Sequence, residues 1–306
     1  MNPKLDDELA AKATAEGQAD APAGDAAGGA RAIHHRPPSI WRGARAAVGL
    51  ELRGYFRTAD TVFFTFLFPV LLLGIFGTAF SVQGDVGTLP DGTGGISMAE
   101  YYLPGMVASA ILLSGLQNLA IDIAREKSEG WLKRLGGTPL SPVSYFLGKV
   151  GMILITTLLQ VALLFAFAAV VLGVRLPSEP ELWLRFGGLF LLGIATMSLL
   201  GIALSALPRS SRSASAVVLP VVLVLQFISG VFLMFTMLPE WLQNVAAVFP
   251  LKWLAQGMRS VFLPEHFAEL EPGGSWDLGL VVLNLSVWLL AGLVVSLLTF
   301  RWTRRS

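Results

Sequence analysis

The sequence predicts an all-α integral membrane protein with six transmembrane helices. Hydrophobic residues make up 54% of the chain and charged residues only 14%, whereas soluble domains carry about 25% charged residues. Six long apolar segments contain very few charges, and each can cross the ~30 Å hydrocarbon layer as a helix. Only helices suit runs this long and this uniformly apolar. The predicted spans are residues 62–80, 103–124, 145–174, 183–207, 213–238 and 276–300.

The first 38 residues are predicted to be a disordered cytoplasmic tail. Up to Arg31 the segment is rich in Ala, Gly, Asp and Glu and has no aromatic residue, so it cannot bury enough surface to offset the entropy of ordering. Its scattered acidic residues and the lack of an apolar core also indicate that it is not a secretory signal.

Residues 39–61 are predicted to form an amphipathic helix at the membrane interface. Apolar side chains form one stripe at helical spacing, and most of the arginines lie off it, with Arg45 at its edge. A basic amphipathic helix before a first span is typical of the cytoplasmic interface. An ordinary solvated helix is the alternative. The stripe consists of Trp41, Ala44, Val48, Leu52, Tyr55 and Phe56.

The segment 125–142 is predicted to be a compact polar element at the membrane surface. It is short, carries charges of both signs, ends in Gly and Pro residues and lies between two apolar spans. Such a segment cannot lie in hydrocarbon and could be pushed by a soluble partner. The alternative is a solvated loop that only contributes to the charge asymmetry of the protein.

The segment 239–263 is predicted to form a re-entrant helical pair on the outer side, before the last span. It is too apolar for a free external loop, but Pro250 interrupts it, so neither half can cross the membrane. A seventh full span is the alternative. Within the spans, glycines at 187, 188, 193 and 201 could allow close helix packing, and Pro69 and Pro220 are expected to kink their helices.

The positive charges predict that both termini, including residues 301–306, are cytoplasmic. With that orientation, 18 of the 22 Lys and Arg residues fall in or beside cytoplasmic segments. The protein is therefore expected to be a multi-pass protein of the cell (cytoplasmic) membrane. This topology would put the segment 239–263 outside.

The chain shows no sign of chemistry of its own. It has no cysteine, no phosphate-binding Gly-Lys-Ser/Thr loop and no cluster with metal-ligand spacing. We therefore expect no enzyme activity, no bound cofactor and no nucleic-acid partner. The spans also hold few ionisable groups; Asp122 and Lys149 lie close enough to the cytoplasmic edge to reach the interface.

Neutral polar and soft apolar residues could line a path for an amphipathic molecule. Amides in such spans can equally serve hydrogen bonds between helices. The residues of this possible substrate path are Gln117, Gln226, Phe227, Phe232 and Met234.

The chain resembles the ABC-2 type permeases, the membrane subunits of bacterial ATP-binding-cassette exporters, and most closely the daunorubicin-resistance membrane proteins. The resemblance runs from Trp41 to the C-terminus. Its most specific part is the charged segment 125–135 followed by Thr-Pro-Leu-Ser at 138–141, and a second match covers residues 239–243, 249–251 and 257–259.

The resemblance implies a permease that is driven by separate ATPase subunits, which bind ATP and Mg²⁺. It further implies pairing with a second permease subunit, identical or not, in contact with membrane lipids, and export of a drug, lipid or glycolipid. The ATPase would dock on a coupling helix whose residues are Arg125, Glu126, Lys127, Glu129, Gly130, Lys133 and Arg134.

Two other functional classes remain open from the sequence. A secondary transporter driven by an ion gradient is disfavoured, because mid-membrane carboxylates are scarce. A membrane-embedded enzyme would need a cluster of acids at one face, and the outer-loop candidates are Asp85, Asp91 and Glu100.

Overall fold

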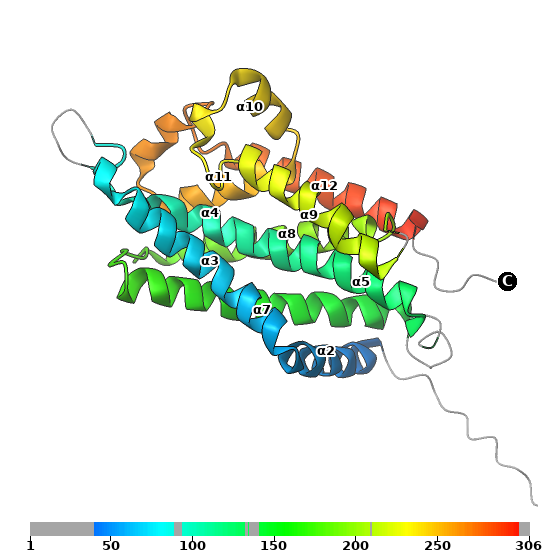
Figure 1. Ribbon diagram of the computed structural model, residues 1–306. Helices are drawn as coiled ribbons and strands as arrows, with labels where there is room; N and C mark the ends of the chain where they lie inside the picture. The colour runs from blue at the N-terminus through cyan, green and yellow to red at the C-terminus, as the bar shows by residue number, and fades with distance from the viewer. Residues whose placement is uncertain (1–39, 89–93, 132–133, 135–140, 209, 300–306) are drawn as a thin grey trace, which may run out of the picture. The chain divides into compact units, whose positions relative to one another are not determined.

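The second predicted span forms the central helix of the protein (Figure 1). The computed structural model describes residues 40–88, 94–131, 134, 141–208 and 210–299. The central helix consists of α4 (Met98–Leu112), the π-helix η2 (Leu113–Asn118) and α5 (Leu119–Ser128). Its most apolar stretch is 72% buried, compared with 17–50% in the other five spans. The remaining spans therefore pack around it.

A capping box starts the central helix. The Ser97 hydroxyl accepts a hydrogen bond from the Glu100 amide at 3.2 Å, and the Glu100 carboxylate accepts one from the Ser97 amide at 2.8 Å. Together they satisfy two backbone donors that the helix leaves free, an arrangement that contributes about 1 kcal/mol. Glu100 thus has a structural role, and Asp85 is exposed in the loop before it. Asp91 lies outside the described residues.

The described residues contain six helices long and apolar enough to cross a membrane, as predicted. The sequence also predicted the all-α class correctly, since the only β feature in the described part is an isolated bridge between Val86 and Ile96. Besides the central helix, the spans are α3 (Ala59–Ala79), α7 (Pro142–Val170), α8 (Pro180–Leu204), α9 (Ser211–Ile228) and α12 (Leu278–Thr299). A short 3₁₀ helix, η1 (Ser81–Gln83), follows α3.

The fifth span is shorter than predicted. Helix α9 ends at Ile228 rather than near Leu238, because Gly230 takes a positive φ of 76° and turns the chain. The next residues run against the central helix, where a Cβ atom on Gly105 would lie 3.1 Å from the Val231 carbonyl oxygen. A 3₁₀ helix, η3 (Phe235–Met237), completes this segment.

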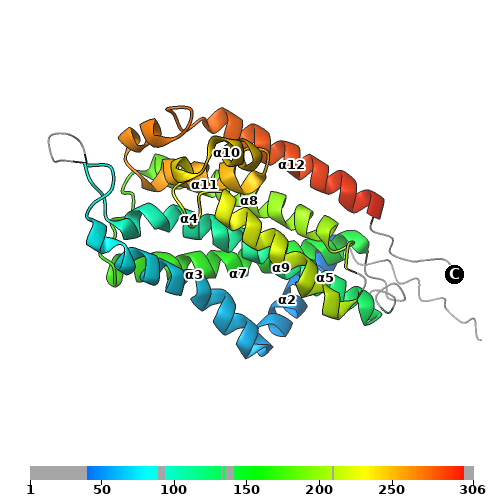
Figure 2. The same ribbon diagram turned by 45° about the horizontal axis from the view of Figure 1, so that its top comes forward.

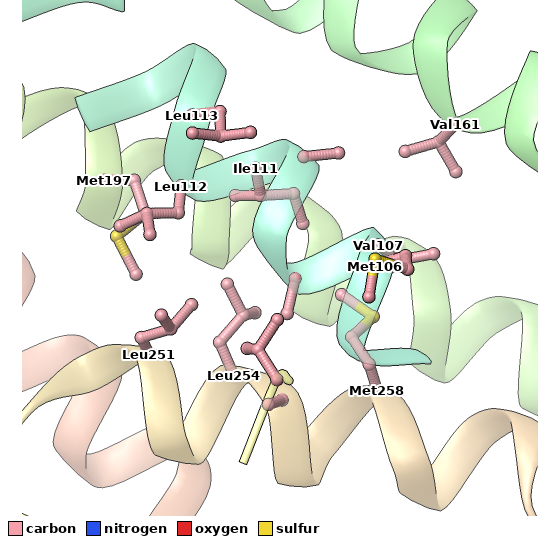
Figure 3. Packing of buried hydrophobic residues seen from close by; sticks show 14 of the residues in the cluster. Met106, Val107, Ile111, Leu112, Leu113, Val161, Met197, Leu251, Leu254 and Met258 are labelled. Carbon is pink, nitrogen blue, oxygen red and sulfur yellow. The ribbon is translucent and has the colours of Figure 1, made fainter. Parts of the chain in front are cut away.

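The segment after the fifth span forms two helices separated at Pro250, as predicted. Helix α10 is Glu240–Ala246, and α11 (Pro250–Phe262) has the proline at its first position. In Figure 3, Leu251, Leu254 and Met258 point from α11 toward the side chains of α4. Helix α11 also contacts α8 and α12, so it is enclosed by the bundle. A 3₁₀ helix, η4 (Glu265–Leu270), leads toward α12.

Two of the four glycines in the fourth span serve close packing. A Cβ atom on Gly201 would lie 2.5 Å from the Gly115 carbonyl oxygen of η2, and one on Gly193 would lie 2.8 Å from Leu254 of α11. Gly187 and Gly188 have no such neighbour within 4 Å. Close approach at Gly201 and Gly193 holds α8 against the central helix and α11.

Helix α2 (Ile40–Arg57) packs beside the first half of α7 (Figure 1). Cβ atoms on Gly148 and Gly151 would lie 2.5 and 2.6 Å from side-chain atoms of Ala47 and Val48. Much of the predicted apolar stripe therefore packs on protein, although Trp41 remains 75% exposed. The four arginines of α2 are all exposed.

Candidate coupling face and substrate groove

The predicted coupling segment begins on the last turns of the central helix. Helix α5 ends at Ser128, and Gly130 follows with a positive φ of 77°, a conformation that glycine adopts without a Cβ penalty. This glycine turns the chain away from the helix axis. Residues 132–133 and 135–140, and with them the predicted coupling residue Lys133, lie outside the described residues.

Most of the predicted coupling residues that the structure describes are exposed. The side chains of Arg125, Lys127, Glu129 and Arg134 are exposed, as is Trp131. The Arg134 guanidinium lies 5.6 Å from the centroid of the Trp131 ring, within cation–π range. We call these five exposed residues the coupling face. They present charges of both signs around an aromatic side chain.

Glu126 differs from these neighbours because it points into the protein. Its carboxylate lies 2.5 Å from the Lys149 ammonium of α7 and accepts a hydrogen bond from the Tyr145 hydroxyl. Lys149 also lies 2.8 Å from the Glu51 carboxylate of α2. One lysine thus joins two carboxylates, and three helices meet at its ammonium group. We refer to Glu51, Glu126, Tyr145 and Lys149 as the lysine cluster.

The position of Lys149 corrects a prediction from the sequence. Its side chain is only 2% exposed, so it points into the protein and does not extend toward water. The two carboxylates make this possible, because a buried ammonium group needs an ionic partner. Burial raises the pKa of the Glu51 carboxyl above its ordinary value, and the nearby Lys149 only partly opposes this shift. Asp122 pairs instead with Arg125 at 3.2 Å on the more exposed side of α5.

A groove of about 510 Å³ lies where α3, η2 and α9 meet; α3 and α9 can be followed in Figure 2. Aromatic, aliphatic, amide and hydroxyl side chains line it. Several of the apolar ones are exposed, such as Phe64 at 67% and Leu223 at 50%. The lining residues are Asp60, Thr61, Phe64, Thr65, Phe68, Leu113, Gln117, Asn118, Leu219, Val222, Leu223 and Gln226.

Two of the five predicted path residues, Gln117 and Gln226, line this groove. Gln226 is buried and donates a hydrogen bond to the Ser109 hydroxyl at 2.9 Å, so it also serves the interhelical bonding that was the alternative. Phe227, Phe232 and Met234 do not line the groove. Phe232 is buried against the Phe227 ring, at 5.3 Å between centroids.

The α3 wall of the groove was not predicted from the sequence. Asp60, Thr61, Phe64, Thr65 and Phe68 follow one another at spacings of one and three or four residues, which places them on one helix face. The apolar background of α3 hides this pattern, because aromatic side chains occur around its whole circumference. The alternation of polar and aromatic residues on that face was the available signal.

Residues 44–263 match the sequence model of a family described as ABC-2 type transporter. This match covers well over half of the chain. The chain belongs to the ABC-2 type transporter family. With its six apolar helices, this ABC-2 permease is a multi-pass membrane protein, and the family supplies the membrane component of transport systems rather than a catalytic unit.

Three relatives are named as transport permeases. The ABC-2 permease is 27% identical over 236 residues to ycf38 of Cyanophora paradoxa, a candidate transport permease, covering 76% of this chain and 77% of the relative. It is 25% identical to YvfS of Bacillus subtilis, also a candidate transport permease, over 49% of this chain and 60% of the relative. It is 21% identical to YbhR of Escherichia coli, a candidate multidrug ABC transporter permease, over 58% of this chain and 48% of the relative. The match thus spans less than two thirds of YvfS and of YbhR.

Proposed function

We propose that this ABC-2 permease is the membrane subunit of an exporter that moves a hydrophobic or amphipathic compound, such as a drug, lipid or glycolipid, out across the cytoplasmic membrane. ATP hydrolysis in separate ABC ATPase subunits, which bind ATP and Mg²⁺, drives the movement. The observation that carries this proposal is the coupling face, an exposed charged surface at the end of the most buried span of a permease family member.

The coupling face suits docking on a soluble protein. Mixed charges around Trp131 allow complementary pairs that fix the register of the two partners, and an exposed aromatic residue is a frequent anchor of interfaces. The last turns of the central helix carry this surface, so a push on it is transmitted along the helix to η2 and the groove.

The lysine cluster extends this transmission to the first span. Glu126 lies among the coupling residues, and its ion pair with Lys149 connects α5 to α7. The second ion pair of Lys149, with Glu51, connects both helices to α2. Only Thr58 separates α2 from α3. A displacement of the coupling face therefore moves both the η2 wall and the α3 wall of the groove.

A second permease subunit would complete the transport path. The groove has exposed apolar walls on α3 and α9 that need cover, either from lipid or from another protein surface. We infer that a second subunit, identical or homologous, faces this groove and that membrane lipids cover the rest of the apolar perimeter. The orientation with both termini in the cytoplasm places the coupling face on the side where ATP is available.

The test is ATP-dependent export by the permease reconstituted with its ABC ATPase. Charge reversal by Arg134→Glu together with Lys127→Glu is expected to lower ATP-dependent export at least about tenfold while the protein remains folded in the membrane. Arg175→Glu is the matched control, because Arg175 is exposed beyond the other end of α7. Unchanged export by the double variant contradicts the docking role.

An ion-gradient mechanism predicts a different result in the same vesicles. Transport that continues without the ATPase and stops when a protonophore is added would identify the permease as a secondary transporter. We expect no transport by the permease alone.

A further inference from the structure

The described lining of the groove carries negative formal charge and no positive charge. Of the described residues that line it, Asp60 alone is ionisable, and no Lys, Arg or His lines it. The other polar groups are neutral: three amides and two threonine hydroxyls. A ligand in this groove therefore meets one negative charge, neutral hydrogen-bonding groups and apolar walls.

Asp60 lies at one end of the α3 wall. It belongs to the first turn of α3, is exposed, and forms no ion pair with any described residue. Phe64 and Phe68 lie on the same helix face, four and eight residues after Asp60. Each step of four residues advances about 6 Å along the helix axis. The carboxylate thus lies at the start of the first apolar span, and the two aromatic side chains follow it along the groove wall.

The arrangement favours a cation over an anion. A positive group near Asp60 gains Coulomb attraction from its carboxylate. The exposed faces of Phe64 and Phe68 attract a cation as well, through the quadrupole of their rings. An anionic headgroup would instead meet a carboxylate with no neighbouring cation among the groove residues.

We propose that the groove binds lipophilic cations, with the positive group at Asp60 and the apolar body against Phe64, Phe68, Leu219 and Leu223. This inference rests on the proposed function, because it assigns the substrate class of the transport path. The amides of Gln117 and Asn118 on η2 provide neutral contacts at the opposite wall.

Two hydrophobic ions of nearly equal size and opposite charge provide the probes. The full-length permease in neutral detergent should bind tetraphenylphosphonium and should bind tetraphenylborate at least about tenfold more weakly. Asp60→Asn should weaken tetraphenylphosphonium binding about tenfold, and Asp60→Glu should retain it. Glu181→Gln is the matched control, because Glu181 is also a first-turn carboxylate of a span but lies outside the groove.

Equal affinity for the two ions, or unchanged cation binding by a folded Asp60→Asn variant, overturns the proposal. If Asp60→Asn does not fold, a second variant decides. Phe64→Cys would be the only cysteine in the chain, and tetraphenylphosphonium should slow its labelling by a maleimide while tetraphenylborate should not. Equal protection by both ions overturns the proposal.

The binding measurement separates this inference from the proposed function. Cation binding needs no ATPase, so cation-selective binding without ATP-dependent export leaves the site in place and removes the exporter mechanism. The other combination is ATP-dependent export without preferential binding of the cation. It supports the exporter and removes the assigned substrate class.

Discussion

At the scale of single residues, the structure gives two lysines positions that their place in the sequence does not indicate. Lys149 lies near the start of the predicted span 145–174 and Lys252 in the predicted outer pair 239–263, and at both places a lysine is expected to extend toward water. Both are buried, with exposures of 2% and 4%. Lys149 has two carboxylate partners, whereas Lys252 hydrogen-bonds to Gln256 at 2.5 Å and lies 3.6 Å from the Trp253 ring centroid. Lys149 is therefore tested best by substitution, and Lys252 by the pH dependence of stability.

Replacement of Lys149 by methionine should destabilise the protein strongly. The variant leaves Glu51 and Glu126 partly buried without their cation, and breaking a buried ion pair costs about 3–5 kcal/mol. Thermal unfolding in detergent should show a lower apparent Tm, and adding Glu51→Gln and Glu126→Gln to Lys149→Met should recover most of the loss. Arg125→Gln is the control, because its exposed pair with Asp122 contributes at most about 1 kcal/mol. Equal Tm values for Lys149→Met and Arg125→Gln would contradict the role of the cluster.

The pH dependence of stability at alkaline pH should show that the Lys252 ammonium group is buried. Burial lowers the pKa of its ammonium group to about 8, below the ordinary value of 10.5, although Glu271 opposes this shift. Between these two values the unfolded chain binds more protons than the folded protein, so stability rises with pH by at most about 1.4 kcal/mol per pH unit. As the pH rises from 8 to 10, the apparent Tm of the natural protein should increase relative to the apparent Tm of the Lys252→Met variant. A constant difference between the two proteins across that range would contradict the assignment.

At the scale of elements, close helix contacts depend on which glycines meet a neighbour. Gly115 in the π-helix η2 and Gly201 in α8 bring two backbones together, and Gly148 and Gly151 do the same for α7 and α2. Without a hydrophobic force between helices in lipid, such contacts and interhelical hydrogen bonds provide much of the stability. One such bond joins η2 to α7, from Ser114 to Gln160 at 3.1 Å.

Alanine in place of glycine should distinguish the two kinds of position within α8. Gly201→Ala forces a methyl group against the Gly115 carbonyl oxygen and should cost about 1–3 kcal/mol. Gly188→Ala has open space and should be neutral, or stabilising by up to about 1 kcal/mol through helix propensity. Thermal unfolding of the two variants in the same detergent is the measurement. Similar Tm values for both would contradict the close contact between α8 and η2.

At the scale of the whole molecule, function depends on which end of the bundle faces the ATPase. The coupling face begins on the last turns of the central helix, whereas α11 packs against the first half of that helix. The two surfaces therefore belong to opposite ends of that helix. The positive charges predict that the coupling face lies inside the cell.

Single cysteines should establish this orientation, because the natural chain has none and gives no background. An impermeant maleimide added to intact cells should label Ser178→Cys in the α7–α8 loop. It should label Ser128→Cys at the end of α5 only after permeabilisation. Both serines are exposed, so access to the reagent depends on the side of the membrane. The reverse pattern would invert the topology and place the coupling face away from ATP.

The fold class, the number of spans and the broken pair at Pro250 could be predicted from the sequence alone, because apolar length and proline position are local properties of the chain. The sequence also indicated a charged segment after the second span, and two of the amides that line the groove. It did not indicate that Glu126 faces inward, that Lys149 is buried between two carboxylates, or that α3 forms a groove wall. These features are visible only in the folded protein, since each depends on side chains that come within a few ångströms across helices far apart in the sequence. The length of α9 was likewise decided by packing of the chain after Gly230 against the central helix, which outweighed the continuous apolar pattern.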